Sequence, residues 1–137
     1  MAYWLVKSEP GAWSWQQQAD AETTHWDGVR NHQAVNNLKA MRVGDRVLFY
    51  HSGEAREIVG IVEVTRAYYP DPHDPSGRFG MVDVSTVAPL ARPVTLAAIK
   101  ADPRLQHLAL VRQSRLSIVP IDDDAWALLC GMGGVQP

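Results

Sequence analysis

The stretch Trp-Asp-Gly-Val-Arg-Asn-His-Gln-Ala-Val-Asn-Asn-Leu, from Trp26 to Leu38, concentrates residue types that could bind a planar ring. A pocket for such a ring needs a flat group for stacking, together with fixed donors and acceptors for the ring edge. Trp26 supplies an indole, Arg30 can stack or hold a phosphate, and Asn31 and Gln33 supply amides with both a donor and an acceptor end. The alternative reading is a tryptophan in the core and an asparagine that caps a helix.

Other site chemistries find no support in the sequence. The single cysteine, Cys130, cannot form an internal disulfide or complete a zinc knuckle, and its apolar neighbours predict a buried, inert thiol. The histidines lack the i, i+4 spacing of a helical zinc pair, and there is neither a phosphate-binding glycine loop nor a serine elbow. The sequence therefore predicts no catalytic residues, no metal and no cofactor.

The elements that must position these residues can be placed from hydrophobic periodicity and from turn residues. Strands are expected at residues 3–6, 46–51, 58–64, 81–87 and 116–119, with a bulge or bend at Gly60. Short helices are expected at residues 13–19, about 31–41, 95–100 and 123–130, and a helical or turn-like segment at 105–110. Residues 20–24 are expected to form a polar loop, and residues 68–80, with three prolines, an extended one.

The order of these elements predicts an α+β fold, because no βαβα series indicates a parallel sheet. We expect a small, curled, mostly antiparallel β-barrel of about five or six strands with peripheral short helices. The chain has 137 residues, of which 46% are hydrophobic, and this suits one domain over residues 1–137 with a single core.

The charge and the apolar runs limit the partners. A formal net charge of −2 argues against tight, sequence-independent binding of duplex nucleic acid, although a local basic rim is compatible with it. No apolar run reaches the roughly 20 residues of a membrane span, and the first residues do not have the pattern of a signal peptide. A cytoplasmic protein without a membrane partner is expected.

Several segments resemble a known family in the order in which they occur. The clearest are Tyr-Trp-Leu-Val-Lys-Ser-Glu-Pro at 3–10, the stretch at 26–38, Gly-Asp-Arg-Val-Leu-Phe-Tyr-His-Ser at 44–52 and Ile-Val-Gly-Ile-Val-Glu-Val at 58–64, followed by similar segments at 69–72, 93–96 and 110–117. Together they resemble the EVE domain of the PUA-like group, which also holds YTH, ASCH and PUA domains. The resemblance implies a PUA-like fold. It also implies a non-catalytic module that binds a modified nucleobase, of the 5-methylcytosine type or otherwise methylated, in DNA or RNA.

The resemblance also implies a set of base-pocket residues. Trp26 would be the stacking wall, with Lys7 and Ser8 beside it. The remaining members would be Arg30, Asn31, Gln33, Tyr50, His51, Ser52, Tyr69, Arg112, Gln113 and Ser114. The chain departs from the family pattern at His32, where relatives often have tyrosine, and at Val35, where they often have arginine or asparagine.

Two alternatives to a nucleic-acid-binding module remain open. One is an RNA-cleaving enzyme like some ASCH relatives, with His51 and Lys7, or His32 and Arg30, as acid–base pairs. The other is a sensor of a small heteroaromatic metabolite that uses the same pocket. A near-neutral rim around the pocket would favour the sensor, and a basic rim would favour a strand with a modified or unpaired base.

Overall fold

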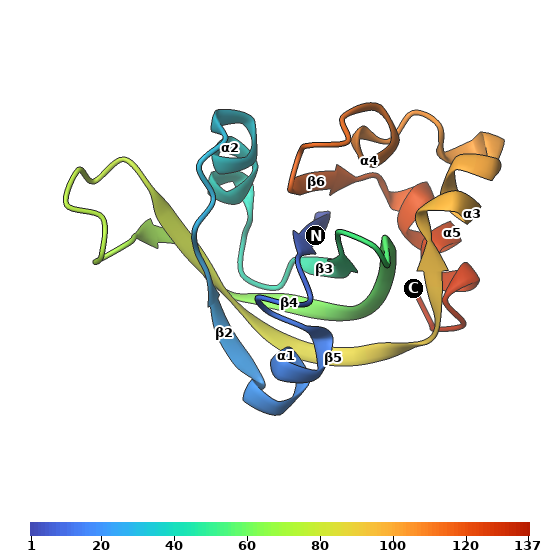
Figure 1. Cartoon of the computed structure of the whole chain (residues 1–137), viewed down its shortest axis with the longest axis horizontal. Helices are drawn as coiled ribbons and strands as arrows, with labels where there is room; N and C mark the ends of the chain where they lie inside the picture. Colours follow the sequence, from blue (N-terminus) through green and yellow to red (C-terminus); the bar gives the residue numbers. More distant parts are fainter.

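A computed structural model of the chain describes residues 1–137 as one six-stranded sheet with five α-helices around it (Figure 1). The strands are β1 (Tyr3–Ser8), β2 (Thr23–Trp26), β3 (Arg46–His51), β4 (Glu57–Pro70), β5 (Gly80–Thr95) and β6 (Ile118–Ile121). The helices are α1 (Trp15–Ala21), α2 (His32–Ala40), α3 (Leu96–Ala101), α4 (Ala109–Arg112) and α5 (Asp123–Met132), with a 3-10 turn at Pro103–Leu105. The strands run in the order β2-β5-β4-β3-β1-β6 across the sheet.

The pairing confirms the predicted α+β, mostly antiparallel class. Four strand pairs are antiparallel, and the exception is β1 with β3, which run parallel. Parallel neighbours need a long crossover, and α1, β2 and α2 supply it here. The expected barrel is corrected to an open, curled sheet, because the edge strands β2 and β6 do not pair with each other.

The sheet curls along the long β4–β5 hairpin, which sweeps under most of the molecule in Figure 1. The register between β4 and β5 shifts between Ile58 and Gly60, which confirms the predicted irregularity. A Cβ atom at Gly60 would overlap the ring of Trp15, so the absence of a side chain lets α1 lie directly on β4. The contact between Trp15 and Gly60 thus holds α1, which follows β1 in the sequence, against β4.

Two expected loops turned out to contain strand, and one expected strand proved longer. Residues 23–26 form the edge strand β2, in which Trp26 alone is buried, and this explains its polar sequence. Residues 68–70 continue β4, so the expected proline-rich loop is confined to 71–79. Residues 88–95 extend β5 beyond the end of β2, where one side of the strand has no neighbour and prolines are tolerated.

The core lies between the concave face of the sheet and the helices α2 and α5. Ala34, Val35 and Leu38 form the buried side of α2, so Val35 packs inward. Cys130 of α5 is also buried, and burial raises the pKa of its thiol to about 11. None of the helices has both the length and the apolar character of a membrane-spanning segment.

The turn before β3 is fixed by a buried carboxylate. Asp45 is 4% exposed and accepts hydrogen bonds from the indole Nε1 of Trp4 (3.0 Å) and from the backbone N–H groups of Ala2 (3.1 Å) and Arg42 (3.0 Å). Burial alone would raise the pKa of Asp45, but the hydrogen bonds from Trp4, Arg42 and Ala2 lower it below its usual range. The carboxylate therefore ties the start of β1 to the end of α2.

Candidate functional site

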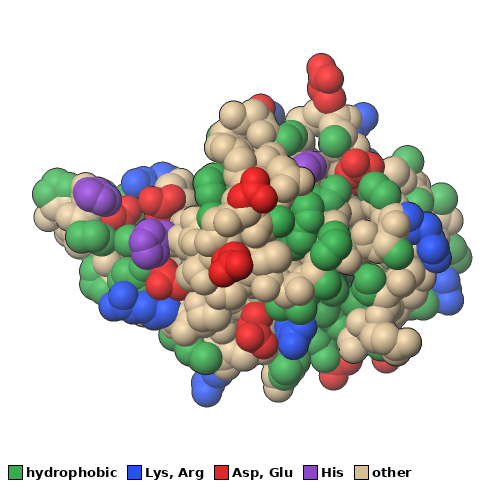
Figure 2. All heavy atoms as spheres, turned by 90° about the horizontal axis from the view of Figure 1, so that it is seen from below, with side chains coloured by type: hydrophobic (Ala, Val, Ile, Leu, Met, Phe, Trp, Pro, Cys, Tyr) green, Lys and Arg blue, Asp and Glu red, His purple; other side chains and the backbone are tan.

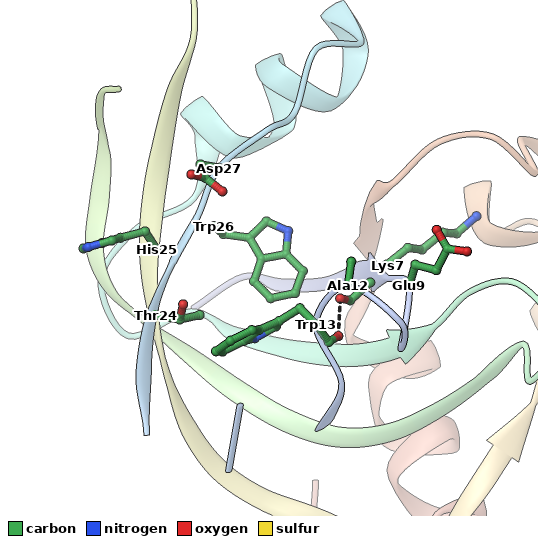
Figure 3. Close-up of a pocket in the computed structure, with 9 residues that line it drawn as sticks. Lys7, Glu9, Ala12, Trp13, Thr24, His25, Trp26 and Asp27 are labelled. Atoms are coloured by element: carbon green, nitrogen blue, oxygen red, sulfur yellow. Dashed lines mark hydrogen bonds between the residues drawn. The ribbon is translucent and has the colours of Figure 1, made fainter. Parts of the chain in front are cut away.

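A hollow lies between the segment after β1 and the strand β2, and we call it the indole pocket (Figure 3). It has a volume of about 470 Å³. Its lining residues are Lys7, Ser8, Glu9, Ala12, Trp13, Thr24, His25, Trp26 and Asp27. Of the predicted site residues, Lys7, Ser8 and Trp26 come together here.

Trp26 is anchored in the core and still borders open space. Its ring packs edge-on against Phe49 of β3, with ring centres 5.6 Å apart and planes at 85°. The residue is 8% exposed, and its indole extends into the indole pocket in Figure 3. A ring held in this way can stack with a ligand at little cost in side-chain entropy.

A second indole, Trp13, lines the indole pocket and was not among the predicted site residues. Its backbone carbonyl accepts a hydrogen bond from Ser8 Oγ (2.5 Å), and its Nε1 donates to Oε1 of Gln18 (2.9 Å). Gln18 is fully buried and its Nε2 donates to the backbone oxygen of Glu22 (3.2 Å). The sequence does contain a signal for Trp13, because the Pro10–Gly11 turn reverses the chain directly after Lys7 and Ser8.

The charges around the indole pocket are mixed. Glu9 and Asp27 place carboxylates at its rim, and Lys7 supplies an ammonium group. Nζ of Lys7 donates to the backbone oxygen of Ser114 (2.9 Å), and burial lowers the pKa of the amine. The ring of His25 points away from the two indoles in Figure 3, and its Nδ1 lies 2.8 Å from Oδ1 of Asp83.

The predicted amide readers lie elsewhere. Asn31, Gln33, Arg112, Gln113 and Ser114 border a separate shallow hollow of about 300 Å³ between α2 and the segment after α4. The Oδ1 atom of Asn31 accepts the backbone N–H of Ala34 (3.0 Å), which caps α2. In this structure Asn31 therefore takes the alternative role of a helix cap.

Tyr50 and Ser52 border a third hollow, of about 200 Å³, beyond the end of β3. We call it the cationic hollow, because the charged side chains that line it are Lys7, Arg56 and Lys100. The Lys7 side chain, which points away from the indoles in Figure 3, is thus shared between the indole pocket and the cationic hollow.

Three further predicted residues border none of these hollows. The guanidinium of Arg30 lies over the ring of Phe79, 4.4 Å from its centre. Nε2 of His51 accepts the backbone N–H of Trp15 (3.0 Å), and burial lowers the pKa of this imidazole. Tyr69 donates to Asp83 Oδ1 (2.5 Å), and burial together with this hydrogen bond raises the pKa of its hydroxyl to about 12.

These positions limit the chemistry of the site. The expected acid–base pair of His51 and Lys7 is not formed, since His51 faces Trp15 while Lys7 reaches toward Ser114. No three His, Cys, Asp or Glu side chains come together as possible metal ligands. What the indole pocket does bring together is two indoles with hydrogen-bonding groups on either side, an arrangement suited to binding a flat polar ring.

Several known proteins are similar to this chain in both sequence and fold. The sequence is 31% identical to human thymocyte nuclear protein 1, in an alignment covering 99% of this chain and 76% of the relative. The crystal structure of the human protein in complex with 5-methylcytosine-containing DNA superposes with a TM-score of 0.87 at 30% identity, covering 100% of both chains. An NMR structure of a Rhodopseudomonas palustris protein has a TM-score of 0.93 at 55% identity, covering 98% of this chain and 94% of that one.

A more distant likeness concerns the fold alone. The YTH domain of a Zygosaccharomyces rouxii protein, in complex with N6-methyladenosine RNA, superposes with a TM-score of 0.58 at 16% identity, over 99% of this chain and 86% of that one. The family model described as the EVE domain matches residues 2–132. This match covers nearly the whole sequence, and the chain belongs to the EVE domain family.

Proposed function

We propose that the chain is a non-catalytic module that binds a modified nucleobase, of the 5-methylcytosine type or otherwise methylated, in DNA or RNA. The observation that carries the proposal is the indole pocket, where Trp13 and Trp26 lie beside Lys7 and Ser8. Support comes from human thymocyte nuclear protein 1, which shares the fold and was crystallised with 5-methylcytosine-containing DNA.

The energetics of such binding are set by stacking. Extruding a base from a duplex costs a few kcal/mol, and the cost is smallest where pairing is already weak. Stacking on an aromatic ring returns about 1–3 kcal/mol per base. The carboxylates of Glu9 and Asp27 can accept hydrogen bonds from an exocyclic amine, and so can Ser8 Oγ, whose own proton is donated to the Trp13 carbonyl.

The methyl group itself contributes less than the ring. Burying one carbon gains about 0.8 kcal/mol, which corresponds to about a fourfold difference in affinity. We therefore expect a single-stranded oligonucleotide with one 5-methylcytosine to bind a few-fold more tightly than its unmethylated counterpart, as measured by calorimetry.

The test of the indole pocket is Trp13→Ala. Trp13 is half-buried, so its loss should destabilise the fold less than Trp26→Ala, which would open a cavity in the core. Losing one stacking partner should weaken oligonucleotide binding by about tenfold. Gln33→Ala, which changes an exposed residue outside the indole pocket, is the matched control. If Trp13→Ala and Gln33→Ala bind as tightly as the unchanged protein, the proposed pocket is wrong.

The mixed rim favours a second candidate function. Around the indole pocket the carboxylates of Glu9 and Asp27 offset the charge of Lys7, and such a near-neutral rim suits a free heteroaromatic metabolite as well as a strand. Parallel titrations with modified mononucleosides and with oligonucleotides separate the two candidates. Equal affinity for both ligands would favour the metabolite sensor.

A further inference from the structure

The cationic hollow beyond β3 has the composition of an anion site. Lys7, Arg56 and Lys100 line it, and no carboxylate does. None of the three ammonium or guanidinium groups forms a salt bridge within the chain. Three positive charges around a single hollow create a local potential that attracts an anion, even though the whole chain has a formal net charge of −2.

A phenol hydroxyl without a partner in the chain lines the same hollow. Tyr50 is 3% exposed as a residue, and no group of the chain forms a hydrogen bond with its phenol oxygen. The oxygen is not sealed from solvent, because Trp126 Nε1 is the one fully covered side-chain polar atom without a partner. The hydroxyl can therefore donate a hydrogen bond to an acceptor that enters the hollow.

The backbone at Arg56 adds to this picture. Arg56 has a φ of 47°, in the left-handed region that favours glycine or asparagine. An arginine in this conformation is strained relative to glycine, and such outliers concentrate where a ligand is held. The positive φ therefore joins the free hydroxyl and the clustered cations as a third, separate observation on the same hollow.

From these observations we propose that the cationic hollow binds a phosphate group, with Tyr50 donating one hydrogen bond and Lys7, Arg56 and Lys100 providing the charge. Ser52 lines the same wall and offers a further hydroxyl donor. The phosphate can belong to a nucleic-acid strand whose base occupies the indole pocket, or to a free phosphate or mononucleotide. Only binding of a nucleic-acid phosphate rests on the function proposed above.

Titration with inorganic phosphate tests the site without any base. At constant ionic strength, the backbone amide resonances of Tyr50, Ser52 and Gly53 should shift saturably with phosphate and not with chloride. Tyr50→Phe removes only the hydroxyl and should weaken phosphate binding by about tenfold. Lys100→Gln should weaken it several-fold.

Lys39→Gln is the matched control, because Lys39 lies in the last turn of α2 as Lys100 lies in the last turn of α3. Lys39→Gln should leave phosphate binding unchanged. The absence of a saturable shift would overturn the proposal. So would equal affinity in Tyr50→Phe, Lys100→Gln and Lys39→Gln.

The second arm identifies the source of the phosphate and uses a single-stranded oligonucleotide with 5-methylcytosine. If a strand phosphate enters the hollow, Lys100→Gln should reduce the slope of log K against log salt by about 0.7. An unchanged slope, with phosphate binding lost, assigns the hollow to a free phosphate or mononucleotide. Saturable phosphate binding that persists in Trp13→Ala, where oligonucleotide binding is lost, keeps this proposal separate from the fate of the indole pocket.

Discussion

At the scale of single residues, the position of the Trp13 ring depends on a glutamine that no ligand touches. Gln18 is fully buried and holds Nε1 of Trp13 at 2.9 Å. We expect Gln18→Leu to weaken oligonucleotide binding several-fold and to lower stability by about 1–3 kcal/mol, because the indole donor loses its partner. Calorimetry and urea denaturation measure the two effects. Gln16→Leu on the exposed side of α1 serves as the control, and equal binding by both variants would contradict the positioning role.

The buried carboxylate of Asp45 predicts a pH dependence. Since its folded pKa is depressed, Asp45 stabilises the fold above its unfolded pKa of about 3.9, and this contribution is lost as the pH falls through the folded pKa. Asp45→Asn should cost about 2–3 kcal/mol at neutral pH, because its amide places a donor against Trp4 Nε1. Urea denaturation from pH 2 to pH 7 should show the difference from the unchanged protein shrinking below about pH 4. A difference independent of pH would refute this assignment.

The sequence predicted three residues of the indole pocket, Lys7, Ser8 and Trp26, and missed Trp13. Lys7 and Ser8 follow directly on a strand that the hydrophobic pattern predicted, whereas Trp26 was selected by its side chain and by the family resemblance, because the strand β2 that holds it was not predicted. Trp13 reaches the indole pocket because the chain reverses after β1. The side-chain oxygen of Asn31 is not available to a ligand, because it caps α2. Neither the chain reversal that places Trp13 nor the use of Asn31 as a cap can be predicted from the residue types of a short segment.

At the scale of elements, α2 depends on the cap that Asn31 provides. Asn31→Ala should cost about 1 kcal/mol, since the backbone N–H of Ala34 loses its acceptor, while Asn31→Ser should restore most of the stability. Oligonucleotide affinity should be the same in both variants. Thermal unfolding and calorimetry give the comparison. A loss of affinity in Asn31→Ser without loss of stability would return Asn31 to the role of a base reader.

In the contact between α1 and β4, the ring of Trp15 lies directly against the backbone of Gly60. A side chain at Gly60 would overlap the Trp15 ring, so Gly60→Ala should destabilise the fold by about 1–3 kcal/mol. Combining it with Trp15→Ala should recover part of this loss, and a double-mutant cycle from urea denaturation measures the coupling. Additive effects would mean that the ring and the strand do not depend on each other.

The elements that the sequence predicted are those with strong local signals. The strand at 46–51 is mostly apolar, the helix at 95–100 has Thr95 as its cap, and the helix at 123–130 has acidic residues at its start, as found in β3, α3 and α5. The strand β2 was not predicted, because only one of its residues is buried and its sequence therefore lacks the alternation of apolar and polar residues that indicates a strand. The parallel pairing of β1 with β3 depends on contacts between distant residues.

At the scale of the whole molecule, the distribution of charge determines how a strand can bind. Basic and acidic side chains are interspersed on the face in Figure 2, and the formal net charge is −2. We therefore expect few phosphate contacts, with a slope of log K against log salt between about −1 and −2.5 for a single strand. Fluorescence titrations across about 50–300 mM salt, over which the Debye length shortens, provide the test. A slope steeper than about −4 would indicate a broad phosphate-binding surface instead.

The central place of β1 determines when the molecule becomes competent to bind. The strand β1, which precedes the other five strands of this sheet in the sequence, lies between β3 and β6, and β6 follows the other five. Contacts between residues so far apart form late, since a long loop must close before they stabilise anything. Lys7 and Ser8 therefore acquire their final surroundings only after β6 has been synthesised, and a chain that lacks β6 offers no partial binder to compete for the ligand.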